Sequence, residues 1–516
     1  MRRFAALVDL LETQPREEGR VRLLTQYLRD APDPDRGQAL ALLTGALELP
    51  LMSPAKLRAL ALARTDEMLF ALSHDYVGDL GETVALIWPE PTGGGGAPRL
   101  DELLARLTSC GRGDLPDTIA AELGRLPVGA RRVLLKLVSG RARPRISGAS
   151  VRCAVAGLGQ CAPGEIAELW HGQTPPYTAL LSWAEGRGPR PAGPSGAALR
   201  PFMPVRPFDP GDLATVSAEA YLVEWAWDGV RAQLAAEGGR TALYDAGGDD
   251  ISAAFPELTE GAGFNAVLDG ELMAGRPDRP ASRGVLQRRL GRASASVTLR
   301  RAVPVHLRVF DILSDDGEDL RGLPLQARRA RLERWFARTM PRGLVLPEIV
   351  EFADWPELDS LRRRPPEGAE GVVVKRRDGV YDAEPSAGGW RKWKREPVRL
   401  NSVLLYARRG ASSTTGDLTV GLWRDSELVS VGRVEANHDA QLAQDIDAWV
   451  RTHTTVRYGP VREVEPTLVL EIVFEAVQRS RRHKSGFVLR RPRVVGIRQD
   501  LSPDDADRLS MLEARA

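Results

Sequence analysis

The spacing of apolar residues divides the chain into a helical part and a part rich in short strands. From residue 1 to about residue 190, leucine and alanine recur every three or four positions, as in the run Phe4, Leu7, Leu10 and Leu11. This period matches one face of an α-helix. The first part is therefore predicted to be all-α.

The pattern changes after about residue 200 to short β-like runs with turns between them. They are followed by a helical stretch at residues 326–339. Short apolar runs bounded by turn residues are typical of strands. The runs are Tyr221–Val223, Ala266–Leu268, Val305–Phe310 and Val372–Val374. This middle part is predicted to be α+β.

Proline marks one boundary and a second change of pattern marks another. Residues 186–210 contain seven prolines, and proline removes an amide donor and fixes φ, so no regular element is expected there. After Pro397, strands at 402–406, 418–423, 428–431 and 467–474 surround a helix near 439–451. Several short strands around one helix indicate a small barrel of the oligonucleotide-binding kind. We predict three domains, at residues 1–195, 200–397 and 398–516.

Composition and charge favour folded domains and leave the partner open. Hydrophobic residues make up 43% and charged residues 27% of the chain, and the net charge is only +2. One stretch is locally basic, and it contains no acidic residue: Arg479, Arg481, Arg482, Lys484, Arg490, Arg491, Arg493 and Arg498. Such a cluster is either a phosphate-binding surface or an ordinary solvated face.

The cysteines and the hydropathy exclude several classes of protein. Cys110, Cys153 and Cys161 are too few and too irregularly spaced for a disulfide framework or a zinc site. No stretch is long and apolar enough for a membrane span, and the first residues lack a signal core. A cytoplasmic protein without a membrane partner is expected.

Five short motifs in the middle part carry the candidate chemistry. They are Glu224-Trp-Ala-Trp-Asp-Gly-Val-Arg231, Leu268-Asp-Gly-Glu-Leu272, Val309-Phe-Asp-Ile-Leu313, Glu370-Gly-Val-Val-Val-Lys375 and Trp390-Arg-Lys-Trp-Lys394. Taken singly, every motif is more often a turn or an exposed strand than a site. Their order and spacing together resemble the covalent nucleotidyltransferase superfamily, and most closely the ATP-dependent DNA ligases, whose first motif is KxDGxR.

The residue types suit chemistry on ATP even without the family. Cations and a metal-binding carboxylate are needed around an α-phosphate, and adenosine needs an aromatic face and partners for its ribose hydroxyls. Residues of the first kind are Glu370, Lys375, Lys392 and Lys394, and residues of the second kind are Phe310, Arg231 and Glu271.

The resemblance implies a role for each matching residue, with ATP and Mg²⁺ as cofactors. Glu224 would belong to the adenine pocket and Phe310 would stack on the base, while Arg231 and Glu271 would hold the ribose. Glu370, with Glu271, would bind Mg²⁺. Lys375 would lie near the nucleotide. Lys392 and Lys394 would face the α-phosphate.

The last part resembles the ligase oligonucleotide-binding domain and its sixth motif. Arg490-x-Pro492-Arg493 and Ile497-Arg498-Gln499-Asp500 match that motif, which in the family orients the β- and γ-phosphates. Arg493 is thus implied as a nucleotide-binding residue and Arg498 as a catalytic one. The helical part, around Leu134 to Arg143, more loosely resembles the DNA-binding domain of cellular-type ligases.

The implied fold is thus multidomain. It combines an all-α DNA-binding domain, an α+β adenylyltransferase domain of the ATP-grasp-like nucleotidyltransferase type, and a β-barrel OB-fold domain.

The chain departs from the family pattern at three places. Ala226 stands where the family has its nucleophilic lysine, Asp245-Ala246 replaces Ser-Arg, and Leu501 replaces a lysine. A methyl group cannot attack an α-phosphate, so self-adenylylation is expected to be lost. The alanine is either an introduced substitution or a natural loss, and the intact surrounding motifs favour an introduced one.

The expected function is ATP-dependent sealing of nicks in duplex DNA, in repair, replication or recombination, by a chain without its nucleophile. The expected partners are ATP and nicked DNA, the expected state is a monomer, and the family suggests a helicase and a nuclease nearby. Two alternatives remain: an RNA ligase or capping enzyme of the same superfamily, and a non-catalytic nick- or end-binding repair factor.

Overall fold

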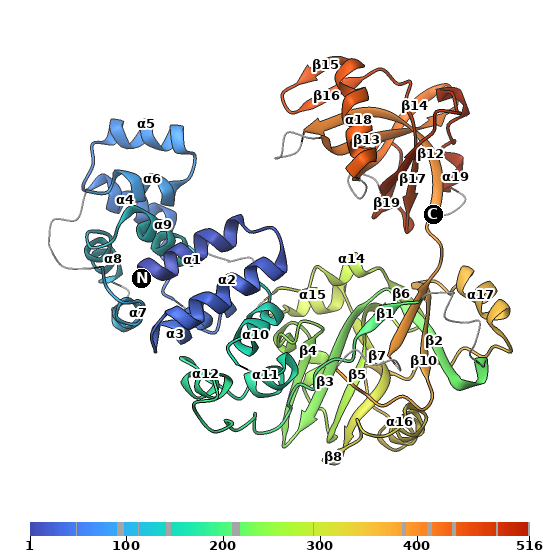
Figure 1. Cartoon of the computed structure of the whole chain (residues 1–516), viewed down its shortest axis with the longest axis horizontal. Coiled ribbons are helices and arrows are strands. Elements are labelled where there is room, and N and C mark those ends of the chain that lie inside the picture. The colour runs from blue at the N-terminus through green and yellow to red at the C-terminus, as the bar shows by residue number, and fades with distance from the viewer. Residues whose placement is uncertain are drawn as a thin grey trace. The chain divides into compact units, whose positions relative to one another are not determined.

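The computed structural model forms two compact units, Met1–Trp393 and Lys394–Ala516 (Figure 1). It describes all residues except 48, 90–96, 112, 141–145, 160, 209–216, 293, 384–388, 410–414, 436–439, 481–482 and 514–516. The predicted basic residues Arg143, Arg481 and Arg482 lie outside the described residues.

The first part of the chain is all-helical, as its apolar period predicts. Its buried leucines, such as Leu11, Leu28, Leu103 and Leu134, form one core. Ser53, Asp66 and Asp79 cap three of the helices by accepting a hydrogen bond from a first-turn amide. The helices are α1 Arg2–Thr13, α2 Glu17–Asp30, α3 Asp35–Thr44, α4 Pro54–Leu62, α5 Glu67–Val77, α6 Leu80–Ile87, α7 Leu100–Ser109, α8 Leu115–Leu123, α9 Val128–Val138, α10 Gly148–Ala156, α11 Pro163–Trp170 and α12 Thr178–Ala184.

Two sheets make up the rest of the first unit. The smaller sheet has the order β1 (Val205–Pro207), β11 (Trp390–Lys394), β10 (Ala369–Arg376), β2 (Tyr221–Trp227). The larger sheet has the order β4 (Arg240–Asp245), β3 (Val230–Glu237), β5 (Ala266–Arg276), β7 (Val305–Asp315), β8 (Glu318–Asp319), with β6 (Arg279–Ala281) on β5 and β9 (Leu344–Val345) on β7. The accompanying helices are α13 Pro256–Thr259, α14 Arg283–Leu286, α15 Val297–Ala302, α16 Leu325–Thr339 and α17 Trp355–Arg363.

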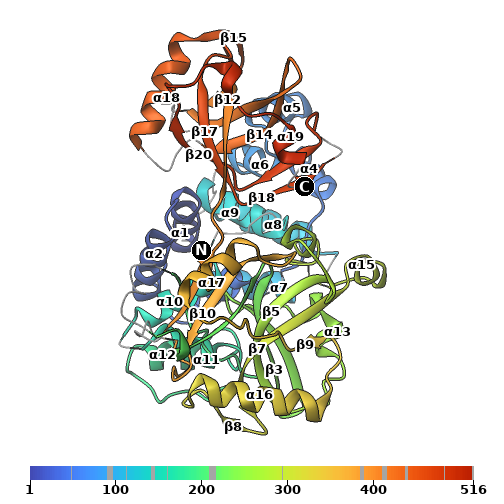
Figure 2. The same cartoon turned by 90° about the vertical axis from the view of Figure 1, so that its right-hand side faces the viewer.

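Alternation along the strands decides which side chains face which layer. In the smaller sheet, Val223, Val372 and Trp393 pack with Leu358 of α17, so the residues between them face the other way. In the larger sheet, one face of β5 and β7 packs against α16 (Figure 2), through residues such as Leu268, Leu307, Leu332 and Trp335. The opposite face of β5 and β7 is therefore turned toward the smaller sheet.

The proline-rich segment contains one short strand, which corrects the expectation of no regular structure there. β1 contains Pro207 and is an edge strand of the smaller sheet, a position where proline is tolerated because the missing amide has no neighbouring strand to serve.

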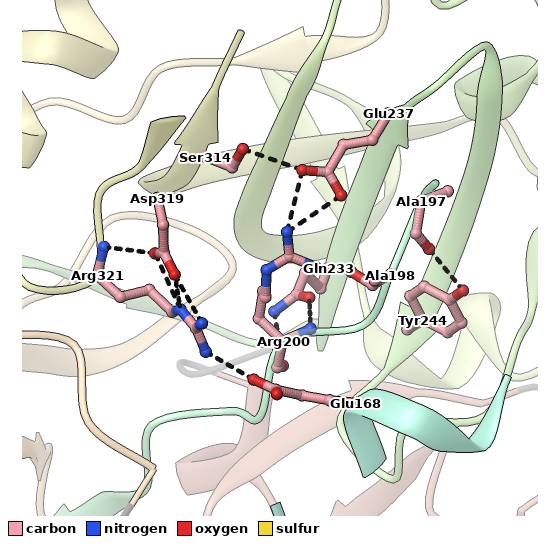
Figure 3. A network of polar contacts seen from close by, with 10 residues as sticks. All are labelled: Glu168, Ala197, Ala198, Arg200, Gln233, Glu237, Tyr244, Ser314, Asp319 and Arg321. Atoms are coloured by element: carbon pink, nitrogen blue, oxygen red, sulfur yellow. Dashed lines mark hydrogen bonds and ion pairs between the residues drawn. The ribbon is translucent and has the colours of Figure 1, made fainter. Parts of the chain in front are cut away.

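A polar network ties the chain after α12 to the larger sheet (Figure 3). Ala197 accepts a hydrogen bond from Tyr244 Oη at 2.8 Å, and Arg200 pairs with Glu237 at 3.0 Å. From α11, Glu168 accepts from Arg321 at 2.9 Å. The helical part and the sheets thus share polar contacts as well as one compact unit.

The second unit is a closed barrel with one helix, α18 (Ala440–Thr452), between its strands. The ring runs β12, β13, β14, β20, β17 and back to β12, which confirms the predicted OB-like fold. Its elements are β12 Val398–Arg409, β13 Thr415–Arg424, β14 Glu427–Glu435, β15 Thr454–Tyr458, β16 Val461–Val464, β17 Val469–Phe474, β18 Ala476–Arg479, β19 Phe487–Arg490, β20 Arg493–Ile497 and α19 Ser510–Glu513. Within the described residues, no helix is long and apolar enough to cross a membrane.

Candidate functional site

The two sheets of the first unit bring most of the predicted site residues together. The residues concerned lie on the facing sides of the sheets, and we call them the inter-sheet site: Glu224, Ala226, Glu370, Lys375, Trp390 and Lys392 from the smaller sheet, and Arg231, Asp269, Glu271 and Phe310 from the larger one. Side-chain contacts between Phe310 and Trp390, and between Phe310 and Lys375, join the two sets.

Ala226 is buried near the middle of the site. Only 3% of its surface is exposed. Its neighbours Trp225 and Trp227 pair with Val372 and Ala369 of β10. Two residues of β10 therefore lie opposite the single residue Ala226 of β2. This is a β-bulge at Glu370 and Gly371, opposite Ala226, and bulges often re-aim side chains beside active sites. The bulge thus places Glu370 and Gly371 across from position 226 in the neighbouring strand.

A carboxylate and an ammonium lie at this bulge. The Nζ of Lys392 is 3.3 Å from Glu370 Oε2. Both side chains are partly exposed, so the pair is open to solvent and to a ligand. The arrangement provides a cation for a phosphate and a carboxylate for a hard metal ion.

Glu224 lies deeper and is already paired with two cations. Arg329 Nη1 donates to Glu224 Oε1 at 3.0 Å, and Lys375 Nζ donates to Oε2. Glu224 is 3% and Lys375 1% exposed. A buried charge needs such a partner because desolvation alone is costly.

Aromatic rings surround the ammonium of Lys375. Its Nζ lies 4.3 Å from the centroid of the Phe310 ring and 4.1 Å from that of Trp390. The two rings meet edge to face, with centroids 5.4 Å apart. An aromatic wall of this kind can take a flat heterocycle such as adenine.

Arg231 is held by a carboxylate that the sequence interpretation did not select. Its guanidinium pairs with Asp269 at 2.7 and 3.2 Å, and Tyr381 Oη donates to Asp269 at 2.6 Å. Burial, with the charge of Asp269, raises the pKa of Tyr381 well above its usual value, so this hydroxyl remains a donor. Arg231 is thus pre-oriented beside the Trp390 ring, 5.0 Å from its centroid.

Glu271 has a strongly shifted acidity. Burial raises its pKa to about 7, while Lys392 and Arg231 oppose the shift and Asp269 adds to it. A carboxyl with this pKa can hold or release a proton near neutral pH.

The carboxylates of the inter-sheet site can be compared with the ligands that Mg²⁺ prefers. Among the described residues, no group of three or more acidic, histidine or cysteine side chains forms a metal cage. Mg²⁺ commonly binds through one or two carboxylates, with water and phosphate oxygens completing the shell. Glu370 and Glu271 fit that pattern with a nucleotide present.

The other predicted residues belong to the second unit. Lys394 Nζ lies 3.5 Å from Glu475 Oε1, and Arg498 pairs with Asp500 at 2.6 Å and donates to Asn401 at 3.1 Å. Arg493 begins β20 and is exposed. The units are described separately, so these three residues stay predictions for the nucleotide site.

The sequence interpretation missed Asp269, Tyr381, Trp390 and Arg329. Asp269 stands two positions before Glu271, so the period of a strand would have placed both on one face. Trp390 lies in a motif that was quoted only for its lysines. Nothing local singles out Tyr381 or Arg329, which reach the site from distant parts of the chain.

Comparison with known proteins identifies the family. A model described as "ATP dependent DNA ligase domain" matches residues 210–394, and one described as "ATP dependent DNA ligase C terminal region" matches residues 411–501. The chain is 32% identical over 416 residues to the "Probable DNA ligase" of Anaeromyxobacter sp. (strain Fw109-5), covering 77% of this chain and 78% of that relative. The chain belongs to the ATP-dependent DNA ligase family.

Further comparisons define how far the similarity extends. The "Probable DNA ligase" of Koribacter versatilis (strain Ellin345) is 33% identical over 340 residues, covering 60% of this chain and 59% of that relative. This chain therefore matches about three fifths of that ligase's length. The solved structure named "Pmar-Lig_Pre" has a TM-score of 0.52 at 14% identity, over 96% of this chain and 99% of its own, and so shares the fold.

Proposed function

We propose that this ligase-family chain binds ATP and nicked duplex DNA and retains the machinery for the final sealing step, but cannot adenylylate itself. The observation that carries the proposal is the buried methyl of Ala226 opposite the bulge with Glu370, on the same face as Lys392. Position 226 has no nucleophilic group, whereas the charged residues around it, Glu370 and Lys392, are present.

The chemistry of the family divides into steps that depend differently on position 226. A lysine there would attack the α-phosphate of ATP, release pyrophosphate and form a phosphoramidate with AMP. The DNA 5′-phosphate would then take the AMP from the lysine. In the last step the 3′-hydroxyl attacks the 5′-phosphate, and AMP leaves. Alanine prevents the first two steps but takes no part in the third.

The residues of the inter-sheet site support binding and orientation for that third step. Phe310 and Trp390 offer rings to the base, and Arg231 is fixed by Asp269 beside them. Lys392 offers positive charge to the phosphates. Bound Mg²⁺ would supply further charge neutralisation at the phosphate oxygens, with Glu370 and Glu271 as its protein ligands.

Two other functions are possible for such a chain. An RNA ligase or capping enzyme would share the nucleotide site, but the large helical domain favours a duplex DNA substrate. A non-catalytic nick-binding factor would also tolerate Ala226. Restoring the lysine separates these alternatives.

The test is the adenylylation of Ala226→Lys by ATP and Mg²⁺, followed by intact-mass measurement. We expect a mass increase of one AMP for this variant and none for Ala226→Gln, which has a long polar side chain without a nucleophilic amine. A folded Ala226→Lys protein without adduct would contradict the proposal. Joining of nicked DNA in preference to nicked RNA by the adenylylated variant would exclude the RNA ligase alternative.

A further inference from the structure

Arg308 is a buried cation on the inward face of the larger sheet, in contact with the residue that follows position 226. It lies on β7, is 8% exposed, and pairs in register with Glu271 of β5. Its guanidinium carbon stacks 3.8 Å from the centroid of the Trp227 ring. Trp227 directly follows Ala226 along β2.

The hydrogen bonds of Arg308 leave it under-satisfied. Its Nη2 donates to the carbonyl of Pro277 at 2.7 Å, but its buried Nε has no partner, and the buried Nε1 of Trp227 has none either. Both groups are donors without acceptor capacity. The described part of the chain thus provides no acceptor for either the Arg308 Nε or the Trp227 Nε1 donor.

Other buried arginines of this unit differ in their partners. Arg289, Arg328 and Arg329 each form an ion pair with a carboxylate. Arg131 uses all three of its guanidinium nitrogens on backbone carbonyls. No ion pair involves Arg308 in the part of the chain that the structure describes, and burial lowers its pKa. Burying an unpaired cation costs free energy unless an anion pairs with it.

The position along the strand suggests which anion fits. Phe310, which meets Trp390 and Lys375, lies two residues further along β7, a distance of about 7 Å at the usual rise per residue. On the facing sheet, Glu224 lies beside Lys375 and Trp227 lies beside Arg308. The site therefore extends from the Phe310 and Trp390 rings to Arg308, a separation that suits a base linked through a sugar to a phosphate.

We infer that Arg308, held in place by Trp227, binds an oxygen of a phosphate group at the Trp227 end of the inter-sheet site. This inference rests on the proposed function and adds a phosphate-binding residue to it. A guanidinium stacked on an indole keeps its planar donors oriented toward a phosphate. In a chain whose position 226 has no ammonium, Arg308 supplies a cation beside Trp227. The phosphate comes either from the nucleotide or from the 5′ end of a nicked strand.

The first test compares ATP, AMP and adenosine by calorimetry on the full chain, with Arg308→Gln and Arg308→Lys. The matched control is Arg301→Gln, an exposed arginine of α15 just before β7. Losing a hydrogen bond to a charged group typically weakens binding roughly 10- to 100-fold. If the phosphate comes from the nucleotide, we expect that loss for ATP and AMP with Arg308→Gln, no change for adenosine, a smaller loss with Arg308→Lys, and none with Arg301→Gln.

A second arm identifies the source of the phosphate. Nicked duplexes with a 5′-phosphate and with a 5′-hydroxyl are compared in the same variants. If the DNA end is the ligand, Arg308→Gln abolishes the preference for the 5′-phosphate and leaves ATP binding unchanged. If the nucleotide is the ligand, the pattern reverses.

Defined results would overturn the inference. Equal weakening of adenosine and AMP would indicate a purely structural role for Arg308, and unchanged binding of every phosphate ligand would show that it contacts none. In both cases the proposed function survives, because the unaltered chain still binds. If the unaltered chain binds neither ATP nor nicked DNA, the proposed function itself fails, and the inference about Arg308 fails with it.

Discussion

Lys375 and Glu224 form a buried ion pair between two adjacent strands of the smaller sheet. The carboxylate is shared with Arg329, and the ammonium lies between the rings of Phe310 and Trp390. The proposed adenine pocket is therefore built around a charge network that is complete without a ligand. Glu224 contributes to the site by fixing Lys375 as well as by any contact that it makes to a base.

Removing Glu224 should destabilise the first unit strongly. Glu224→Ala leaves two buried cations without their shared carboxylate, and breaking a buried ion pair from one side costs about 3–5 kcal/mol. We expect a loss of that size in urea unfolding followed by fluorescence. The control Glu351→Ala changes an exposed glutamate and should cost no more than about 0.5 kcal/mol. A similar small cost for both variants would contradict the network.

Replacing Glu271 should change stability in a pH-dependent way. Burial raises its pKa to about 7 from an ordinary value of 4.5, so the folded state binds this proton more tightly than the unfolded state. Stability contributed by the protonated carboxyl is then lost as pH rises from about 4.5 through 7. Glu271→Gln cannot ionise and should keep that stability.

The expected result is a melting temperature a few degrees above that of the unaltered chain at pH 8, with a difference that shrinks toward pH 5. Glu260→Gln, at an exposed position, should show no such trend. A constant difference at all pH values, or a variant that is less stable at pH 8, would show that the carboxyl of Glu271 is not destabilised in its ionised form.

Most elements of the fold could be predicted from local patterns. The helix expected at residues 326–339 is α16, and the strand expected at Val305–Phe310 begins β7. The bounds were too short for β2 and β5, because the polar residues Glu224 and Asp269 interrupt the apolar runs while still pairing in the sheets. Pairing depends on partners distant in sequence, which a local pattern does not contain.

The candidate site was predicted in its residue types but not in its connections. Motif order selected Glu224 and Lys375 separately, 151 residues apart, and nothing in either motif indicates that they pair. Likewise, nothing in the sequence indicates that Asp269 and Tyr381 lie together and hold Arg231. The bulge opposite Ala226 arises from one extra residue in β10, and only the register of two strands reveals it.

DNA binding should depend steeply on salt. In the second unit, Arg479 and Lys484 are exposed members of the basic stretch, and every phosphate contact contributes about 0.9 to the slope of log K against log salt. Arg479→Gln combined with Lys484→Gln should reduce the slope for a nicked duplex by roughly 1 to 2, as measured by fluorescence anisotropy.

The matched control for this measurement is Arg342→Gln, an exposed arginine of the first unit outside the basic stretch. Its slope should equal that of the unaltered chain. An affinity that does not respond to salt in any variant would contradict binding to a nucleic acid backbone.

The central claim is that Ala226 removes self-adenylylation and leaves the sealing chemistry in place. The most direct measurement uses a synthetic nicked duplex whose 5′-phosphate already carries AMP, with Mg²⁺, the unaltered chain and a denaturing gel. Lys392, Glu370 and Glu271 remain to support the transfer, although the missing lysine charge should slow it by about 10²–10³ relative to Ala226→Lys. We predict joined strands from this substrate and none from an ordinary 5′-phosphorylated nick with ATP. If Ala226→Lys joins the adenylylated nick while the unaltered chain gives no product above the protein-free control, the claim is wrong.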